Sequence, residues 1–279
     1  MTPSNGAAPE KRVFQPGKGS TEAEFIRLDH VEKYYGDHHV LNDICLSVAP
    51  GEVVVIVGRS GSGKSTLLRC VNHLEKIDSG TIYIDGAPAY AYEVDGRKVV
   101  DSPRRISQLR AQVGMVFQRF NLFHHMTALE NVMEAPVHVR GSNRSEARDK
   151  ALSLLAKVGL HGRAHYYPEQ LSGGEQQRVA IARALAMEPL AMLFDEVTSA
   201  LDPELVGEVL AVMRQLAGEG MTMLTVTHEI RFGAEIADRA VFMEDGRIVE
   251  VGPASILRRP QSDRMKQFIR AVLRDKDED

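Results

Sequence analysis

The run Gly58–Ser65, with the sequence GRSGSGKS, has residue types and a spacing that suit the binding of phosphate groups. It follows the apolar stretch Val53–Val57 and leads into helix-forming residues, which predicts a strand, a glycine-rich turn and a helix in that order. Backbone N–H groups in such a turn point inward at a helix N-terminus and bind anions. Lys64 adds a positive charge for the outer phosphates, and Ser65 offers a hydroxyl to Mg²⁺. A flexible Gly/Ser linker would have neither flank, so we interpret the run as a P-loop.

Two carboxylates, Asp195 and Glu196, follow the apolar run Leu190–Phe194. A parallel sheet binds its ligands at the carboxyl ends of its strands, which would place this pair beside the P-loop. At that position Asp195 is expected to hold Mg²⁺ through water, and Glu196 is expected to polarise an attacking water. The two acids could instead begin a surface loop, but the strand before them and the P-loop elsewhere in the chain favour the chemical role.

A third run, Leu171–Arg178 with the sequence LSGGEQQR, predicts a helix that begins after Ser172. A serine at this position caps a helix and leaves exposed amides, which form another anion site. An ordinary capped helix would share these features. A P-loop followed by LSGGE, however, resembles the ATP-binding-cassette (ABC) family, in which this run is the signature motif. The resemblance implies that the signature closes over nucleotide held by the P-loop of a second subunit, in a head-to-tail dimer.

The resemblance extends to further single residues. Gln118, at the end of the run VGMVF, resembles the glutamine that joins the metal and the attacking water to a helical subdomain. Tyr35 resembles the aromatic residue that stacks on adenine, although Tyr34 is a competing choice and a strand-edge core tyrosine is the alternative. Asp202 resembles the aspartate that meets the partner's P-loop, and its place before a proline also suits a helix N-cap. His228, after an apolar strand, resembles the histidine that contacts the γ-phosphate.

The resemblance covers residues 25–258 and implies three sets of site residues. The expected catalytic residues are Glu196, His228 and Gln118. The expected metal-binding residues are Ser65, Gln118 and Asp195. The residues expected to hold ATP are Tyr35, Gly58, Arg59, Ser60, Gly61, Ser62, Gly63, Lys64, Ser65, Thr66, Ser172, Gly173, Gly174, Glu175 and Asp202. Two residues, Arg59 and Val197, stand where proline is common in the family, and neither removes a catalytic group.

The elements that would position these residues begin with short strands and continue as alternating strands and helices. The predicted strands are Phe25–Leu28, Ile44–Val48, Glu52–Val57, Thr81–Ile84, Val113–Phe117, Leu190–Phe194, Thr222–Val226, Ala240–Met243 and Ile248–Val251, the last two joined by a turn. The predicted helices are one opened by a capping box at Thr127–Glu130, one from Ser145 to Gly159, and those at Pro203–Leu216 and Glu229–Ala237. The segment Tyr90–Pro103 is predicted to be rich in turns.

Alternating strands and helices indicate a parallel sheet covered by helices. The helical block at about residues 119–178 looks like an insertion into this core. The fold that the resemblance implies is therefore an α/β P-loop NTPase, an ABC cassette with a parallel β core, an antiparallel β subdomain and an inserted helical subdomain. We expect residues 1–24 to form a disordered leader, 25–258 the ABC ATPase domain and 259–279 a C-terminal helical tail.

Composition limits the classes of partner. Among 279 residues, 34 Lys and Arg against 38 Asp and Glu give a net charge of −4, which argues against nucleic acid as the main partner. The longest apolar runs fall short of the roughly 18 residues that a membrane-spanning helix needs, and the N-terminus lacks the apolar region of a signal peptide. We therefore expect a chain that is soluble by itself. The cysteines, Cys45 and Cys70, suit reduced packing positions, and no CxxC motif or nearby histidine pair supports a metal site formed by them.

Several segments resemble ATPase subunits of bacterial polar amino acid importers, namely residues 72–75, 117–136 and 186–189. Residues 94–105 are similar to an extension in subunits that serve histidine, arginine/ornithine and opine uptake. The resemblance thus implies a subunit that binds and hydrolyses ATP with Mg²⁺ and energises the import of a polar, basic amino acid. It would act as a homodimer of cassettes, peripheral on the cytoplasmic face of the bacterial inner membrane, with two integral membrane permease subunits and, indirectly, a solute-binding protein. The apolar segment Gln118–Glu134 is expected to dock the permease, or to fill the core of its own subdomain.

Two other functions would require features that differ from those of this sequence. A non-transport ABC ATPase that acts on nucleic acid or ribosomes tends to carry tandem cassettes, long coiled coils or zinc modules, and the sequence has one cassette and none of these. A nucleotide-binding regulator without turnover would be favoured by the loss of Glu196 or His228, and both residues are present. The sequence does not name the transported amino acid, because other chains select it.

Overall fold

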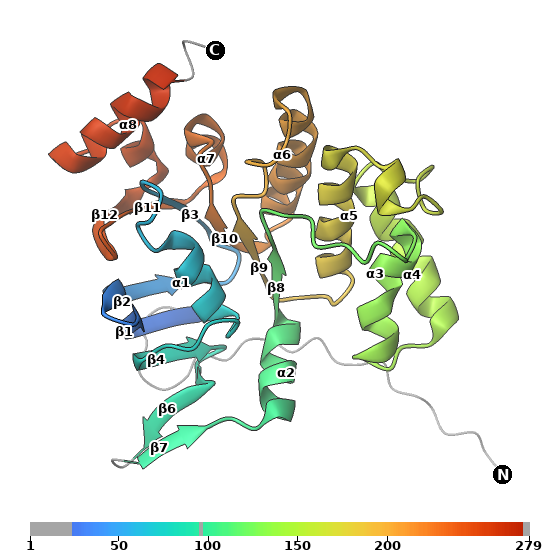
Figure 1. Cartoon of the computed structure of the whole chain (residues 1–279), viewed down its shortest axis with the longest axis horizontal. Coiled ribbons are helices and arrows are strands. Elements are labelled where there is room, and N and C mark those ends of the chain that lie inside the picture. Colours follow the sequence, from blue (N-terminus) through green and yellow to red (C-terminus); the bar gives the residue numbers. More distant parts are fainter. Residues whose placement is uncertain (1–23, 95–96, 276–279) are drawn as a thin grey trace.

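The core of the structure is a six-stranded sheet with the strand order β12-β11-β3-β10-β9-β8 (Figure 1). The computed structural model describes residues 24–94 and 97–275, so the predicted leader lies, apart from Glu24, outside the described residues. Strand β12 lies antiparallel to β11 at one edge, and the other strands run parallel. The strands of this sheet are β3 (Val53–Val57), β8 (Val113–Val116), β9 (Ala191–Asp195), β10 (Thr222–Val226), β11 (Arg239–Glu244) and β12 (Arg247–Pro253).

The central strands of this sheet are buried on both faces. Every residue of β3 is at most 3% exposed. Val54 and Ile56 pack with α1 (Lys64–Val71) and a second sheet, whereas Val53 packs with the helical block and Val55 with the C-terminal helices. Side chains of a strand alternate between the two faces, and a parallel sheet covered on both faces is apolar throughout. The unbroken apolar runs in the sequence have this cause.

The second sheet is antiparallel, with the order β2-β1-β4-β5, and packs against α1. Its strands are β1 (Ile26–Tyr35), β2 (His38–Val48), β4 (Ser79–Ile84) and β5 (Ala87–Ala89). Strands β1 and β2 are longer than the predicted Phe25–Leu28 and Ile44–Val48. Register shifts interrupt the β1–β2 pairing, and an extra residue reverses the inward and outward alternation from which a strand is predicted.

A helical block lies on the opposite side of β8 and β9 from α1 (Figure 1). It contains α3 (Ala128–His138), α4 (Arg144–Lys157), a 3₁₀ turn (Pro168–Gln170) and α5 (Gly173–Leu185). The capping box of α3 is confirmed: Thr127 Oγ1 accepts from the amide of Glu130 at 3.3 Å, and the Glu130 carboxylate accepts from the amide of Thr127 at 2.8 Å. Helix α4 begins earlier than the predicted Ser145, because Asn143 is its N-cap and accepts from the Ser145 amide at 2.8 Å.

The segment predicted as turn-rich, Tyr90–Pro103, holds a hairpin and leads into a helix that the sequence did not indicate. The hairpin pairs β6 (Ala91–Val94) with β7 (Arg97–Val100), and the helix is α2 (Pro103–Gln112). Ser102 caps α2 by accepting from the amide of Arg105, and proline occupies the first turn, as is common at helix starts. Leu109 is the buried residue of α2, so the helix has little of the apolar period that predicts helices.

The C-terminal part adds three helices and a 3₁₀ turn: α6 (Pro203–Gly218), α7 (Ile230–Ile236), Ala254–Leu257 and α8 (Asp263–Asp275). Helix α8 packs on β11, where the rings of Phe268 and Phe242 lie 5.3 Å apart between centroids. Glu250 fixes the start of α8 by accepting from the amides of Gln261 and Ser262 at 2.9 Å. None of the helices in the described ranges is long and apolar enough to cross a bilayer.

Asn131, on α3, holds the loop that precedes this helix. The side chain is 0% exposed. Its Oδ1 accepts from the amide of Phe123 at 2.8 Å, and its Nδ2 donates to the carbonyls of Phe123, Met126 and Thr127 at 3.1, 3.1 and 3.0 Å. One buried side chain thus replaces water for several backbone groups of the loop.

We expect Asn131→Ala to lower the free energy of unfolding by about 2–4 kcal/mol, because these backbone groups lose their partner in a buried setting. Chemical denaturation of the purified chain measures this value. The control is Glu134→Ala, a partly exposed residue of the same helix, which should change the free energy of unfolding by no more than about 0.5 kcal/mol. Equal stabilities of the two variants would show that the loop does not depend on Asn131.

Candidate active site

The P-loop joins the carboxyl end of β3 to the start of α1, as the sequence predicts. Lys64 and Ser65 are the first residues of α1, and Gly63 precedes them with a φ of 93°. A Cβ at Gly63 would lie 2.6 Å from the carbonyl oxygen of Val40, so both the backbone angle and the space require glycine. The N-terminus of α1 has no side-chain cap, and its first amides therefore remain available to an anion.

The ammonium group of Lys64 turns back onto the P-loop. Nζ donates to the carbonyls of Gly58 and Arg59, each at 2.9 Å, and the residue is 4% exposed. Burial lowers the pKa of Lys64, while the carboxylates of Glu196 and Asp195 oppose that effect. Lys64 is thus a buried cation between the loop and the acids that end β9, where a phosphate group would meet it.

Two of the three predicted metal-binding residues, Ser65 and Asp195, are brought together. The Ser65 hydroxyl donates to Asp195 Oδ1 at 2.6 Å, and the guanidinium of Arg69 lies 3.7 Å from Oδ2. Asp195 is 2% exposed, and burial raises its pKa against the opposing effects of Ser65 and Arg69. A hydroxyl and a carboxylate at the mouth of the P-loop are oxygen ligands of the kind that Mg²⁺ prefers.

Glu196 and His228 also meet, from the ends of neighbouring strands β9 and β10. Oε1 of Glu196 lies 3.0 Å from Nε2 of His228, and the hydrogen bond from His228 lowers the pKa of Glu196, with burial opposing it. Glu196 has a φ of 48°, a left-handed conformation that costs a non-glycine residue about 1–3 kcal/mol. The amide and hydroxyl of Ser199 both donate to its carbonyl and help to hold this turn. Glu196 is therefore a strained, ionised carboxylate beside Lys64.

Two tyrosines compete for the role of stacking on adenine, and their surroundings differ. The ring of Tyr34 is already stacked on His39, with centroids 4.1 Å apart and planes at 9°. Tyr35 is 45% exposed, and the Lys33 ammonium lies 5.0 Å from its ring centroid. Burial raises the pKa of Tyr35, with a hydrogen bond to Glu75 adding to the effect. Tyr35 thus presents the freer ring face.

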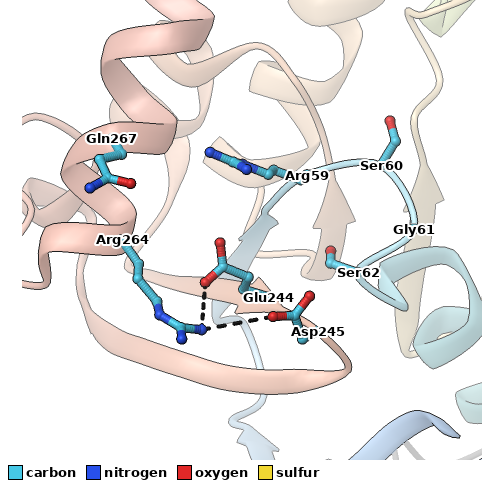
Figure 2. Close-up of a pocket in the computed structure, with 8 residues that line it drawn as sticks. All are labelled: Arg59, Ser60, Gly61, Ser62, Glu244, Asp245, Arg264 and Gln267. Carbon is cyan, nitrogen blue, oxygen red and sulfur yellow. Dashed lines mark hydrogen bonds and ion pairs between the residues drawn. The ribbon is translucent and has the colours of Figure 1, made fainter.

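A cavity of about 390 Å³ lies between the P-loop and α8 (Figure 2). The guanidinium of Arg264 lies 2.8 Å from Glu244 and 3.8 Å from Asp245, and the Arg59 side chain extends from the loop toward α8. The residues that line the cavity are Arg59, Ser60, Gly61, Ser62, Glu244, Asp245, Arg264 and Gln267. The sequence did not identify the α8 side of this cavity, because Arg264 lies 199 residues after Ser65 and no sequence pattern marks it. Val197, the other departure from the family pattern, is 3% exposed and adds to the apolar cluster on the helical side.

The predicted signature residues form a helix start of their own. Ser172 accepts from the amide of Glu175 at 3.2 Å, and the Glu175 carboxylate accepts from the amide of Ser172 at 2.8 Å and from Arg163 at 2.9 Å. A Cβ at Gly173 would lie 3.1 Å from Leu201, so the loop that carries Asp202 packs against the signature of the same chain. In Figure 1, β8 and β9 separate α5 from α1. Within one chain the signature and the P-loop therefore do not meet.

Gln118 and Asp202 are not joined to the cluster at the P-loop. Gln118 is exposed after β8, and Asp202 is the N-cap of α6 by position, although its side chain makes no capping hydrogen bond. Sequence reasoning missed two residues that hold the loop at Gln118: Gln177, 0% exposed, donates to the carbonyl of Phe117 at 3.0 Å, and Arg183 donates to the carbonyl of Asn121 at 2.7 Å. The only sign of Gln177 and Arg183 in the sequence is that each is a polar residue on the side of a predicted helix that becomes buried.

Residues 41–199, more than half of the chain, match the ABC transporter family. The chain belongs to the ABC transporter family. The cluster at the P-loop and the separate signature helix are thus parts of an ABC cassette that binds and hydrolyses ATP. The predicted fold, a parallel core with an antiparallel sheet and added helices, is confirmed.

Proteins of this ABC family resemble the chain over nearly their full length. The arginine transport ATP-binding protein ArgV of Corynebacterium glutamicum is 55% identical over 249 residues, which cover 89% of this chain and 98% of ArgV. The glutamine transport ATP-binding protein GlnQ of Escherichia coli is 55% identical over 248 residues, 88% of this chain and 99% of GlnQ. The dimeric, post-hydrolysis structure of the ATP-binding cassette MJ0796 with ADP and Pi has a TM-score of 0.70 and 35% identity, covering 82% of this chain and 98% of that one.

Proposed function

We propose that the chain is the ATP-hydrolysing subunit of an importer for a polar, basic amino acid, working as a homodimer with permease subunits on the cytoplasmic face of the bacterial inner membrane. The proposed ATP hydrolysis is supported most directly by the contacts at the P-loop. Ser65 and Asp195, and Glu196 and His228, form hydrogen-bonded pairs around the buried Lys64 at the P-loop. The relatives named for arginine and glutamine transport support the transported class.

The residues at the P-loop fit a nucleotide with Mg²⁺. Ser62 Oγ is buried without a hydrogen-bond partner among the described residues, and the first amides of α1 are uncapped. These groups and Lys64 would bind the phosphates, while Ser65 and Asp195 would hold the cation. When bound, Mg²⁺ neutralises charge that develops on the phosphate oxygens. Tyr35 would stack on the adenine, and exposed Gln118 would reach the site when the subdomain moves toward it.

Glu196 would polarise the water that attacks the γ-phosphate. Its carboxylate is ionised, because the hydrogen bond from His228 lowers its pKa, so an acceptor for the water's proton is present. His228 would orient Glu196 and contact the γ-phosphate. The hydrogen bond with His228 holds the carboxylate in place, and its negative charge interacts with the ammonium group of Lys64.

The separation of signature and P-loop within one chain supports a composite site between two chains. Ser172, Gly173, Gly174 and Glu175 would close over ATP bound to the partner's P-loop. The side chain of Asp202, which makes no capping hydrogen bond to α6, would face that P-loop. Closing on ATP and opening after hydrolysis gives two states, which would drive alternating access in the permease. A solute-binding protein would deliver the amino acid to the permease without contacting this chain.

The loop before α3 is the proposed docking surface for the permease. Phe123 is 43% exposed there, with the Arg183 guanidinium 5.6 Å from its ring centroid, while Leu122 and Leu129 are buried in the subdomain core. Asn131 and Arg183 fix the backbone of the loop, so an exposed aromatic ring stands on a rigid support. A firmly held apolar residue of this kind suits contact with a helix of a partner protein.

We expect Phe123→Asp to abolish coupled transport in reconstituted vesicles and to leave the basal ATPase rate of the isolated subunit unchanged. A charge at this position would have to be desolvated on docking, which costs binding free energy. The control is Leu190→Asp. Leu190 is 53% exposed and precedes β9, at the amino ends of the parallel strands, so this variant should support normal transport. Loss of basal ATPase or of the folded state in Phe123→Asp would mean that the ring belongs to the subdomain core.

ATP-dependent uptake of labelled arginine and glutamine tests this function, measured after the chain is reconstituted with the permease subunits and the solute-binding protein that co-purify with it. Uptake of arginine in excess of glutamine is expected for a basic amino acid importer. Preferred uptake of glutamine would show that the transported amino acid is polar but not basic. Uptake of no polar amino acid, with ATPase activity retained, would contradict the transport role.

A further inference from the structure

A cluster of three side chains outside the ATP site lies on the antiparallel sheet, where β1 is irregular. Leu28 pairs with Leu46 and Val31 pairs with Ile44, so two residues of β1, Asp29 and His30, oppose the single residue Cys45 of β2. This arrangement is a β-bulge, in which the extra residue redirects side chains. His30 has a φ of 48°, a left-handed conformation that is uncommon for a residue other than glycine.

The bulge is accommodated by both neighbours of β1. On the other side, the pairing with β4 gains a residue between Asp29 and Glu32, and a Cβ at Gly80 would lie 2.2 Å from the carbonyl oxygen of His30. Only glycine, with its φ of 85° there, leaves room for the bulged backbone. The irregularity is thus part of the packing of three strands.

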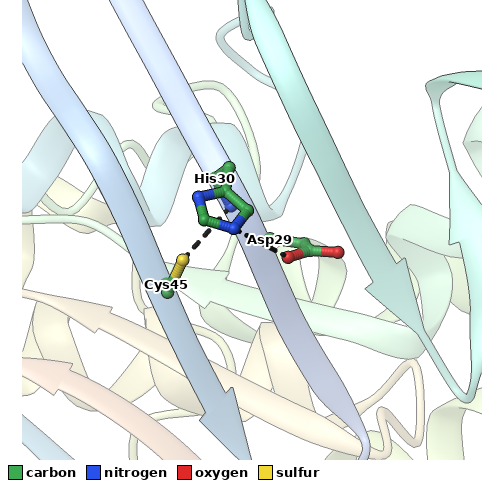
Figure 3. Close-up of side chains that lie close together, drawn as sticks. All are labelled: Asp29, His30 and Cys45. Carbon is green, nitrogen blue, oxygen red and sulfur yellow. Dashed lines mark hydrogen bonds and ion pairs between the residues drawn. The ribbon is translucent and has the colours of Figure 1, made fainter.

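The bulge brings three different donor atoms to one place (Figure 3). A carboxylate oxygen of Asp29, an imidazole nitrogen of His30 and the sulfur of Cys45 all lie within 4.8 Å of one another. The His30 amide donates to Cys45 Sγ at 3.4 Å, which helps to hold the sulfur beside the histidine. His30 and Cys45 are exposed and Asp29 is partly exposed, so the cluster lies at the surface.

Asp43, which also has a left-handed φ of 54°, orients the imidazole of His30. Its Oδ1 lies 2.6 Å from Nδ1 of His30, which places the ring proton on Nδ1 and leaves Nε2 free. Nε2 lies 3.9 Å from Oδ1 of Asp29, whereas Oδ2 of Asp29 faces Arg27 at 3.6 Å. Histidine ligands of metals commonly donate one ring N–H to a carboxylate and bind the metal through the other nitrogen. His30 has this arrangement, with Asp43 at Nδ1 and Asp29 near Nε2.

We propose that Asp29, His30 and Cys45 form a binding site for a divalent cation of the zinc class. A donor set of oxygen, nitrogen and sulfur suits Zn²⁺, whereas Mg²⁺ and Ca²⁺ take oxygen ligands. Binding converts the Cys45 thiol into a thiolate and releases its proton to solvent. Three protein ligands on an exposed face leave a fourth position for water. The site is independent of the ATP site and of the transport role.

The test uses the tag-free, reduced, nucleotide-free full chain and Co²⁺, because Zn²⁺ has no d–d spectrum. We expect one Co²⁺ per chain with a thiolate-to-cobalt charge-transfer band, and displacement of that band by Zn²⁺. Cys45→Ser should remove the band, and His30→Ala should weaken binding by at least about 100-fold, since each removes a ligand. Asp43→Asn should keep the band but weaken binding by about 10–100-fold, as loss of an orienting partner does.

The control is His165→Ala, an exposed histidine of the helical block that should leave cobalt binding unchanged. Thermal melts without metal check that each variant is folded, and Zn²⁺ should raise the melting temperature of the unaltered chain and of His165→Ala but not of Cys45→Ser. Absence of the charge-transfer band in the unaltered chain would overturn the proposal. Unchanged zinc affinity in Cys45→Ser and in His30→Ala would also overturn it and would assign the metal to other histidines.

Discussion

Replacing Glu196 with glutamine is expected to lower kcat for ATP hydrolysis by about 10²–10⁴-fold, the usual contribution of a general base. Glutamine keeps the shape of the side chain but has no carboxylate to accept the proton of the attacking water. The P-loop groups are untouched, so ATP should bind as before. A cassette that binds ATP and cannot hydrolyse it should remain closed, and Glu196→Gln should elute as an ATP-dependent dimer in size-exclusion chromatography.

The matched control for this variant is Glu188→Gln. Glu188 also has a left-handed φ, of 47°, but it pairs with Arg140 and Lys150 on the surface, at the amino side of β9. Its replacement should leave turnover within about twofold of the unaltered chain, as expected for a surface substitution. Turnover of Glu196→Gln at the level of Glu188→Gln would remove Glu196 from the catalytic role.

The residues of the proposed ATP site could be predicted from the sequence because of their positions in it. Lys64, Asp195 and His228 each follow an apolar run that forms a buried parallel strand, and parallel strands collect their carboxyl ends at one edge of the sheet. Short motifs after such runs therefore meet in space, whatever the length of chain between them. The hydrogen bonds of Ser65 with Asp195 and of Glu196 with His228 have this origin.

Other features depend on contacts that leave no periodic pattern. Helix α2 was missed because its sequence is polar around one buried leucine, and Asn131 and Gln177 look like ordinary polar residues until the loops they bond are in place. The cluster at Cys45 was not expected, since its histidine lies 15 residues away and approaches only through a bulge. A bulge changes the register by one residue, which sequence patterns do not resolve.

Two chains are proposed to share each ATP site, and an experiment that mixes two inactive variants tests this arrangement. Lys64→Ala removes the buried cation of the P-loop, and Ser172→Arg blocks the signature; each variant alone should lose nearly all ATPase activity. In a head-to-tail dimer, a mixed pair has one site with both defects and one site with neither. Random exchange of equal amounts makes half of the dimers mixed, and each mixed dimer has one of its two sites intact. The mixture should therefore recover about a quarter of the original activity.

Steady-state ATPase activity of that mixture is the measurement, after circular dichroism has shown that both variants are folded. A mixture of Lys64→Ala with the double variant Lys64→Ala/Ser172→Arg has no intact P-loop and must stay inactive, which excludes contamination as a source of activity. Recovery in the first mixture and none in the second is the result we predict. No recovery in the first mixture, although the mixed dimer forms, would show that P-loop and signature act within one chain and would contradict the shared site.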